Sequence, residues 1–230
     1  MNNRVVTVFG GSGFVGRYVV RLLAASGLRV RVAVRDIEKA HFLKTAGDLG
    51  QLSIVPTSIG SDEEVAQAVH GSDWVVNTVG VLYERGSRSF QAIHVDGAAR
   101  VAKAAALAGA DRLVHISALG ADDSSPSAYS RSKAAGEAAV LASFPKSTIL
   151  RPSVIFGPED GFFNLFADMG RITSVMTYFT NINPKTEDGG GTAFQPVFAG
   201  DVALAIECAL SQDIHTGRIY DIGGPAIYDM

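Results

Sequence analysis

The sequence predicts an α/β fold built on a doubly wound parallel sheet. Short runs of β-branched residues alternate with alanine-rich segments at helical spacing, which is typical of βαβ units. A glycine-rich turn, Gly10 to Gly16, separates the first such run from the first helical segment. The chain has 230 residues, of which 47% are hydrophobic and 19% charged, so it can bury a sizeable core.

The alternation defines the expected elements as far as Arg151. The expected strands are Val5 to Phe9, Arg29 to Val34, Leu52 to Val55, Trp74 to Thr78, Leu113 to Ser117 and Thr148 to Leu150. The expected helices are Phe14 to Ala25, Glu63 to Val69, Asp96 to Ala108 and Ala128 to Ala142. Strands and helices in this order predict a Rossmann-type core over residues 1–160.

The pattern is weaker in residues 161–230, which we expect to form a partial substrate-side region. A short helix is expected at 162–170, and the glycine- and asparagine-containing stretch 171–194 suggests an irregular excursion. Asp201 is a plausible N-cap for a helix from Val202 to Leu210, and a strand follows at Arg218 to Ile222.

Composition limits the classes of partner and location. A formal net charge of −3 gives no broad basic field, so nucleic acid is not an expected partner. The single cysteine, Cys208, cannot form an internal disulfide, which suits a reducing compartment. No apolar run approaches the roughly 20 residues of a transmembrane span, and we expect a soluble, cytoplasmic protein.

The glycine turn is the main functional signal. Gly10, Gly13 and Gly16 form a G-x-x-G-x-x-G pattern placed between a predicted strand and a predicted helix. Such a turn lets the backbone approach a pyrophosphate, toward which the N–H groups at the helix start point. Gly16 is expected to allow close packing of the helix on the sheet. A purely structural glycine turn is the alternative.

The end of the second expected strand indicates which dinucleotide is bound. Sites for NAD usually place Asp or Glu here, whereas this chain has Val34 followed by Arg35. A guanidinium pairs bidentately with a phosphate, so Arg35 favours NADP(H). Asp36, one residue later, is an argument for NAD instead. The alternative interpretation of Arg35 is an ordinary solvated charge in a loop.

Further candidate residues follow later strands. Thr78, Val79 and Gly80 come at the carboxyl end of the fourth strand, where a doubly wound sheet binds its ligand. Tyr129 and Lys133 are four residues apart on a helix, so the ammonium is expected to lower the pKa of the phenol and make it a general acid or base.

The histidines give no comparable signal. His94 has no apparent partner and is interpreted as structural, and the other four histidines are scattered without metal-ligand spacing. No metal site is predicted.

Six phrases follow one another along the chain: GGSGFVG, HVDGAARVAKAA, LVHISALGAD, YSRSKAAGE, ILRPSVIFGPEDGFFN and FQPVFAGDVA. With them the sequence resembles the short-chain dehydrogenase/reductase superfamily, in its extended or atypical branch. Together the phrases also resemble the NADPH-binding accessory subunits of respiratory complex I and their bacterial homologues.

The resemblance implies roles for individual residues. Gly10, Gly13, Phe14 and Val15 would hold the pyrophosphate, and Arg35 the 2′-phosphate. Tyr129 and Lys133 would contact the nicotinamide ribose. The residues that would flank the nicotinamide are Pro152, Ser153 and Val154.

Two departures from the family argue against efficient catalysis. Active members have a Ser or Thr at the position occupied here by Ala118, and the candidate hydroxyl of Ser117 is one residue early and expected on the other face. The family also continues past the strand that ends near Ile222, and residues 171–194 match it poorly. The expected lid over a substrate is therefore partial.

The sequence leaves three functions open. The first is an accessory-subunit-like protein with largely structural NADPH, docked on a respiratory membrane complex at the inner membrane, in the mitochondrial matrix if the source is eukaryotic. The second is an NADP(H)-dependent reductase or a sugar-nucleotide-type epimerase or dehydratase, which would use Tyr129 and Lys133. The third is a redox-sensing regulator. The sequence does not indicate an oligomeric state.

Overall fold

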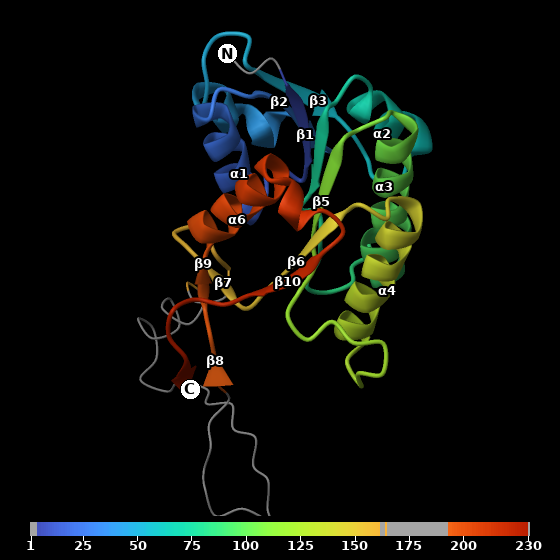
Figure 1. The fold of residues 1–230 in the computed structure, drawn as a ribbon, viewed down its shortest axis with the longest axis vertical. Coiled ribbons are helices and arrows are strands. Elements are labelled where there is room, and N and C mark those ends of the chain that lie inside the picture. The colour runs from blue at the N-terminus through green and yellow to red at the C-terminus, as the bar shows by residue number, and fades with distance from the viewer. Residues whose placement is uncertain (1–3, 162–163, 165–192, 230) are drawn as a thin grey trace, which may run out of the picture.

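A seven-stranded parallel sheet forms the centre of the computed structural model, which describes residues 4–161, 164 and 193–229. The strand order is β10-β6-β5-β4-β1-β2-β3, and every pairing in this sheet is parallel. Helices cover both faces of the sheet (Figure 1). The predicted doubly wound α/β fold is confirmed.

The strand positions agree closely with the sequence pattern. The first two strands have the predicted bounds, and the others differ by a few residues at their ends. The strands of the main sheet are β1 (Val5–Phe9), β2 (Arg29–Val34), β3 (Leu52–Pro56), β4 (Trp74–Asn77), β5 (Arg112–Ile116), β6 (Thr148–Pro152) and β10 (Ile219–Ile222).

The helices divide between the two faces as Figure 1 shows. Helices α1 (Phe14–Ala25) and α6 (Ala199–Ser211) pack on one face. The opposite face is covered by α2 (Asp62–Val69), α3 (Ala98–Leu107) and α4 (Ala128–Ser143).

Alternation along the strands produces one hydrophobic core on each side of the sheet. On β1, Val6 and Val8 face α1 and α6, whereas Phe9 contributes to the core beneath α2, α3 and α4. On β2, Val32 and Ala33 divide in the same way. Both faces of the central strands are therefore buried, as a parallel sheet requires.

Local signals explain several helix ends. Ser61 caps α2 by accepting a hydrogen bond from the Glu64 N–H, while the Glu64 carboxylate accepts one from the Ser58 N–H. Ser127 caps α4 in the same manner through the Ser130 N–H. Helix α1 has no side-chain cap, because Gly13 occupies that position.

Three details of the prediction were wrong. A π-helical turn, η2 (Gln91–Gly97), precedes α3, so the expected start of that helix at Asp96 is inside this turn. Strand β4 ends at Asn77, one residue before Thr78. Helix α6 begins at Ala199, and Phe198 rather than Asp201 occupies the cap, so Asp201 is in the first turn, where a carboxylate suits the helix dipole.

The later part of the chain returns to the main sheet. Helix α6 packs against α1, and β10 pairs with β6. The remaining short elements are η1 (Glu38–Thr45), η3 (Asp213–His215), β7 (Ile155–Phe156) paired with β9 (Val197–Phe198), and β8 (Ala193–Phe194) paired with β11 (Tyr228–Asp229). The expected helix at 162–170 and the excursion at 171–194 lie almost entirely outside the described residues.

Candidate functional site

The glycine turn connects β1 to α1 and requires glycine at two positions. Gly10 has φ +76°, in the left-handed region that side chains rarely adopt. A Cβ at Gly16 would lie 2.2 Å from the Gly10 carbonyl oxygen, so α1 can approach the turn only without one. The turn therefore brings uncapped N–H groups to the carboxyl edge of the sheet, which suits an anionic ligand.

Two adjoining cavities extend from this turn over the carboxyl ends of the strands, with volumes of about 440 and 700 Å³. They share the turn itself and the chain just after β4, where the strand order reverses between β1 and β4. Such a switch point is where doubly wound sheets bind ligands. The shared lining residues are Gly10, Gly13, Thr78, Val79, Gly80 and Val81.

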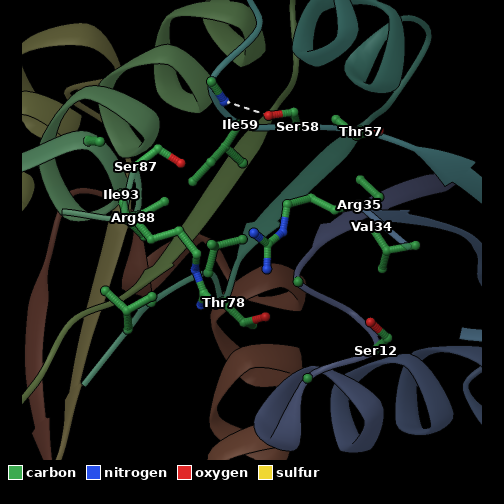
Figure 2. A pocket seen from close by; sticks show the side chains of 18 residues that line it. Ser12, Val34, Arg35, Thr57, Ser58, Ile59, Thr78, Ser87, Arg88 and Ile93 are labelled. Atoms are coloured by element: carbon green, nitrogen blue, oxygen red, sulfur yellow. Dashed lines mark hydrogen bonds between the residues drawn. The ribbon is translucent and has the colours of Figure 1, made fainter. Parts of the chain in front are cut away.

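The smaller cavity contains Arg35, as the sequence predicts for the phosphate-binding end (Figure 2). Asp36, the residue that argued for NAD, does not line this cavity. Its carboxylate accepts a hydrogen bond from the Lys39 N–H and pairs with the Lys39 ammonium at 3.3 Å. These contacts lower the pKa of Asp36, and they engage the carboxylate away from the cavity.

The larger cavity brings together the other predicted site residues. Tyr129 and Lys133 from α4 line it together with residues of the glycine turn and with Ser117, which follows β5. The remaining predicted residues that line it are Phe14, Val15, Gly16, Pro152, Ser153 and Val154. The parallel sheet explains this convergence, because the carboxyl ends of β1, β4, β5 and β6 meet at one edge.

Lys133 is 4% exposed, and its ammonium donates a hydrogen bond to the Ile116 carbonyl oxygen at 2.9 Å. Burial lowers the pKa of Lys133 to about 8, although the carboxylate of Glu137 acts to raise it. The hydrogen bond ties the ammonium to the carboxyl end of β5, and Lys133 is among the residues that line the larger cavity.

Tyr129 does not have the lowered pKa that the sequence predicted. Burial raises the pKa of its phenol, and the effect of the Lys133 ammonium is not among the causes of the shift. The ammonium is instead directed at the Ile116 carbonyl. The ring packs edge-on against Phe90 and His94, with centroid distances of 5.8 and 5.5 Å. In this structure Tyr129 is a neutral phenol.

Ser117 is engaged away from the position of a substrate. Its hydroxyl donates to Glu137, which is 4% exposed. The Glu137 carboxylate also forms a two-point ion pair with Arg151, at 2.8 and 2.6 Å. Ala118 lines the larger cavity at the next position and has no hydroxyl. The pair of residues therefore offers no free hydroxyl to orient a carbonyl.

His94 is buried and bonded through both ring nitrogens. The Val81 N–H donates to its Nε2 at 3.0 Å, so its Nδ1 carries the proton and donates to the Ser132 hydroxyl at 2.8 Å. Burial and the nearby Lys133 lower the pKa of His94 to about 4. These bonds fix the chain after β4 to α4, which is a structural role.

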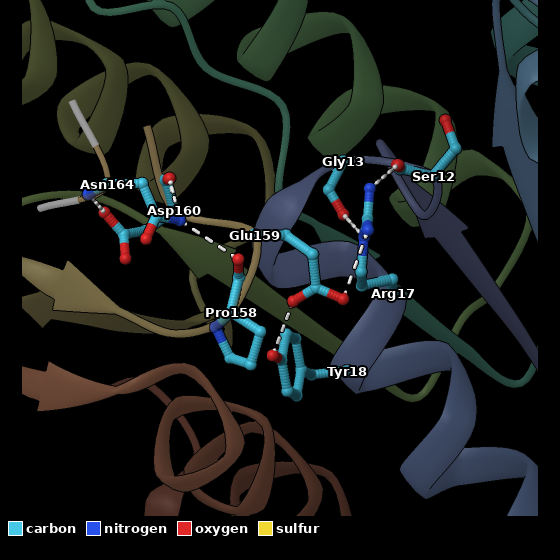
Figure 3. A network of polar contacts seen from close by, with 8 residues as sticks. All are labelled: Ser12, Gly13, Arg17, Tyr18, Pro158, Glu159, Asp160 and Asn164. Atoms are coloured by element: carbon cyan, nitrogen blue, oxygen red, sulfur yellow. Dashed lines mark hydrogen bonds and ion pairs between the residues drawn. The ribbon is translucent and has the colours of Figure 1, made fainter. Parts of the chain in front are cut away.

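Polar side-chain contacts that the sequence did not predict connect α1 to the chain after β7 (Figure 3). The Glu159 carboxylate pairs with Arg17 at 3.3 Å and accepts a hydrogen bond from the Tyr18 hydroxyl at 2.6 Å. Arg17 also donates to the Gly13 carbonyl at 3.3 Å. The glycine turn is thereby joined to a segment about 140 residues later, a separation that no local pattern reveals.

The described residues contain neither a membrane-spanning helix nor a cluster of metal ligands. None of the helices in ranges 4–161 and 193–229 is long and apolar enough to cross a membrane. Within the same ranges, no group of three or more His, Cys, Asp or Glu side chains is arranged to hold a metal ion.

The strand order, the glycine turn at the switch point and the crevice beside Tyr129 and Lys133 define a nicotinamide-dinucleotide-binding domain of the short-chain dehydrogenase/reductase type. Residues 10–165 match the NAD(P)H-binding family, and the chain belongs to this family.

The most similar curated relatives include respiratory subunits. The chain is 32% identical over 228 residues to the mitochondrial NADH-ubiquinone oxidoreductase 40 kDa subunit of Neurospora crassa, with 99% of this chain covered. It is 36% identical over 225 residues to the mitochondrial NADH dehydrogenase [ubiquinone] 1 alpha subcomplex subunit 9 of Mus musculus, with 97% covered. The chain spans 58% of the length of each of these relatives.

An enzyme is also among the relatives. Ceramide reductase of Caulobacter vibrioides is 37% identical over 167 residues, which are 71% of this chain and 51% of that protein.

Solved structures share the fold at low identity. Pal from Bacillus thuringiensis superposes with a TM-score of 0.79 at 18% identity, covering 98% of this chain and 79% of that one. UDP-glucuronic acid 4-epimerase from Bacillus cereus, solved with UDP-glucuronic acid and NAD, gives 0.77 at 17% identity with the same coverage. These likenesses concern the fold alone.

Proposed function

We propose that the chain is an NADPH-binding protein of the accessory-subunit type, in which the nucleotide mainly stabilises the domain. One observation carries this proposal: the residues expected to bind a dinucleotide line adjoining cavities, but Tyr129 has no hydroxyl partner from the chain after β5. Ala118, where the family resemblance leads us to expect that hydroxyl, lines the cavity without one, and the Ser117 hydroxyl donates to Glu137. The crevice is therefore better suited to holding a cofactor than to turning over a carbonyl substrate.

NADPH is proposed over NADH because of the smaller cavity. Arg35 lines it, and the nearest candidate carboxylate, Asp36, is paired with Lys39. A guanidinium favours a 2′-phosphate, whereas a carboxylate at this place would repel it. A nucleotide that binds only the native state at 100 times its dissociation constant would stabilise the domain by about 2.7 kcal/mol.

The proposed partner is a respiratory membrane complex, on which the domain docks from the side of a soluble compartment. Support comes from the two respiratory relatives, at 32% and 36% identity. Location follows from the partner: the matrix side of the inner membrane in a mitochondrion, or the cytoplasmic side in a bacterium.

The test is to denature the purified protein and identify any released nucleotide by chromatography and mass spectrometry. About one NADPH per chain supports the proposal. Protein that is purified empty and binds NADPH weakly and reversibly would count against a structural cofactor. NAD as the released nucleotide would contradict the argument from Arg35.

A second candidate is an NADP(H)-dependent reductase, or an epimerase or dehydratase on the same site. It is favoured by the presence of Tyr129 and Lys133 in one cavity and by the reductase relative at 37% identity. The bound cofactor would supply the hydride. The Tyr129 hydroxyl, held neutral by burial, would donate its proton to the carbonyl oxygen, and Lys133 would bind the ribose.

Single-turnover oxidation of bound NADPH with candidate carbonyl substrates tests this second function. Tyr129→Phe should abolish the reaction, because the proton donor is lost, whereas NADPH affinity should fall by no more than about tenfold, because Lys133 would still bind the ribose. Equal rates in the wild-type and Tyr129→Phe proteins would exclude Tyr129 as the donor.

A further inference from the structure

The smaller cavity contains a second arginine, Arg88, that the sequence did not single out. Figure 2 shows Arg88 and Arg35 extending toward one another over Thr78, from opposite sides of the cavity. Neither guanidinium forms a hydrogen bond or ion pair with any residue in the described part of the chain. Two positive charges that converge without a carboxylate between them repel one another, so the arrangement suits an anion.

Arg88 is the last residue of a tight backbone turn that begins at Arg85. Arg85 and Arg88 exchange backbone hydrogen bonds of 3.2 and 3.1 Å across a tight turn, in which Gly86 has φ +57°. Just beyond the turn, the Phe90 N–H donates to the Glu84 carboxylate at 2.7 Å. These hydrogen bonds fix the backbone of the turn on both sides, and with it the position of the Arg88 backbone.

The rest of the cavity fits an adenosine. Its lining combines apolar side chains from several elements with side chains that carry hydroxyl groups (Figure 2). A flat base is accommodated by the apolar walls, while the diphosphate is accounted for by the N–H groups of the glycine turn. The apolar residues include Val34, Ile59 and Ile93, and the hydroxyl residues include Ser12, Thr57, Ser58, Thr78 and Ser87.

We propose that Arg88 is a second binding residue for the phosphate on the adenosine ribose, so that Arg35 and Arg88 hold the NADPH 2′-phosphate from two sides. This inference rests on the proposed NADPH function. A 2′-phosphate has three peripheral oxygens and can accept from two planar guanidinium groups at once. NADH has no such group, so Arg88 determines which cofactor is preferred.

The experiment measures dissociation constants of NADPH and NADH by calorimetry on nucleotide-depleted full-length protein. The variants are Arg88→Gln, Arg35→Gln and, as a matched control, Arg85→Gln, whose side chain is in the same turn but does not line the cavity. Arg88→Gln should weaken NADPH by about tenfold and leave NADH within about twofold, because only the phosphate contact is lost. Arg85→Gln should change neither constant.

Three results would overturn the inference. If Arg88→Gln binds NADPH as tightly as Arg85→Gln does, Arg88 makes no phosphate contact. If it weakens NADPH and NADH equally, Arg88 contacts a part that the two nucleotides share. In both cases, wild-type protein that binds NADPH more tightly than NADH would leave the proposed function intact. The third result is wild-type protein that binds the two nucleotides equally well, which would refute both the proposed NADPH function and this inference.

Competition by two fragments gives an independent measurement. Adenosine 2′,5′-diphosphate should displace NADPH from the wild-type protein at about tenfold lower concentration than adenosine 3′,5′-diphosphate, if the two guanidinium groups are placed for the 2′ position. The Arg88→Gln protein should reduce this difference. Equal competition by the two fragments would show that the cavity does not select the 2′-phosphate and would overturn the inference.

Discussion

Replacing Glu137 by alanine should destabilise the nucleotide-free protein by about 3 kcal/mol, because it removes one partner of a buried ion pair. Glu137 is 4% exposed and accepts from Arg151 at 2.8 and 2.6 Å and from Ser117. The Arg151 side chain is 26% exposed, so water can partly hydrate its guanidinium when the Glu137 carboxylate is removed. Removing one partner of a buried ion pair costs roughly 3 to 5 kcal/mol of unfolding free energy, and the expected loss for Glu137→Ala is at the lower end of that range.

Urea denaturation followed by circular dichroism measures this cost. For a chain of this size about 3 kcal/mol corresponds to a fall in Tm of roughly 6 to 12 °C. Glu63→Ala removes an exposed carboxylate from the first turn of α2 and is the control, with an expected change within about 0.5 kcal/mol.

A double-mutant cycle with Arg151→Met isolates the pair. Either single substitution leaves the other charge without its partner, so the double variant should be more stable than the sum of the single effects by at least about 1 kcal/mol. Two outcomes would refute the reasoning: a Glu137→Ala cost below about 1 kcal/mol, or single effects that add within about 0.5 kcal/mol.

Three further predictions concern the crevice. Gly16→Ala places a Cβ 2.2 Å from the Gly10 carbonyl oxygen and should weaken NADPH binding at least about tenfold by calorimetry; unchanged affinity would contradict the packing role of Gly16. The folded-state pKa of Lys133 is about 8, below its ordinary value of 10.5, so between these pH values the unfolded chain binds more protons. The unfolding free energy of the nucleotide-free protein should therefore rise across that window, by up to about 3 kcal/mol, and denaturation at several pH values should show a flatter profile for Lys133→Met. Ala118→Ser restores a hydroxyl beside Tyr129 and should raise single-turnover NADPH oxidation by about tenfold or more if a carbonyl substrate binds there; no increase with any carbonyl tested would argue against the reductase function.

The strands and the first helix were predictable because their patterns are local. The bounds of β1, α1 and β2 follow from alternation, from the glycine turn and from the helical spacing of buried residues. The π-helical turn before α3 was not predictable, because its residues satisfy the same apolar spacing as an ordinary helix. Strands β7 and β9 have two residues each, too few for any period.

The site was predictable to the extent that motifs mark the carboxyl ends of strands. Arg35 lines the crevice because it directly follows β2, whereas Tyr129 and Lys133 line it from α4, at the four-residue spacing that the sequence shows. The direction of the Lys133 ammonium was not predictable, since it depends on a carbonyl of β5 that helical spacing does not describe. Arg88 was missed because an exposed arginine beside glycine and serine has the composition of any solvated loop.

The contacts between Arg17 and Glu159 were beyond sequence reasoning for a different reason. Each residue is ordinary in its own segment, and only the fold brings the two side chains together (Figure 3). Pairs of this kind need either a structure or a set of aligned homologues to become visible.

The position of β10 at the edge of the sheet has a consequence for synthesis of the protein. The Ser153 N–H, beside the predicted nicotinamide position, donates to the Ile222 carbonyl oxygen at 2.8 Å, and β6 has no other neighbour on that side within the described sheet. A chain emerging from the ribosome in order completes six of the seven strands long before Ile222 appears. Until Ile222 has left the exit tunnel, β6 has no partner on that side of the described sheet, and its free edge is open to association with other chains.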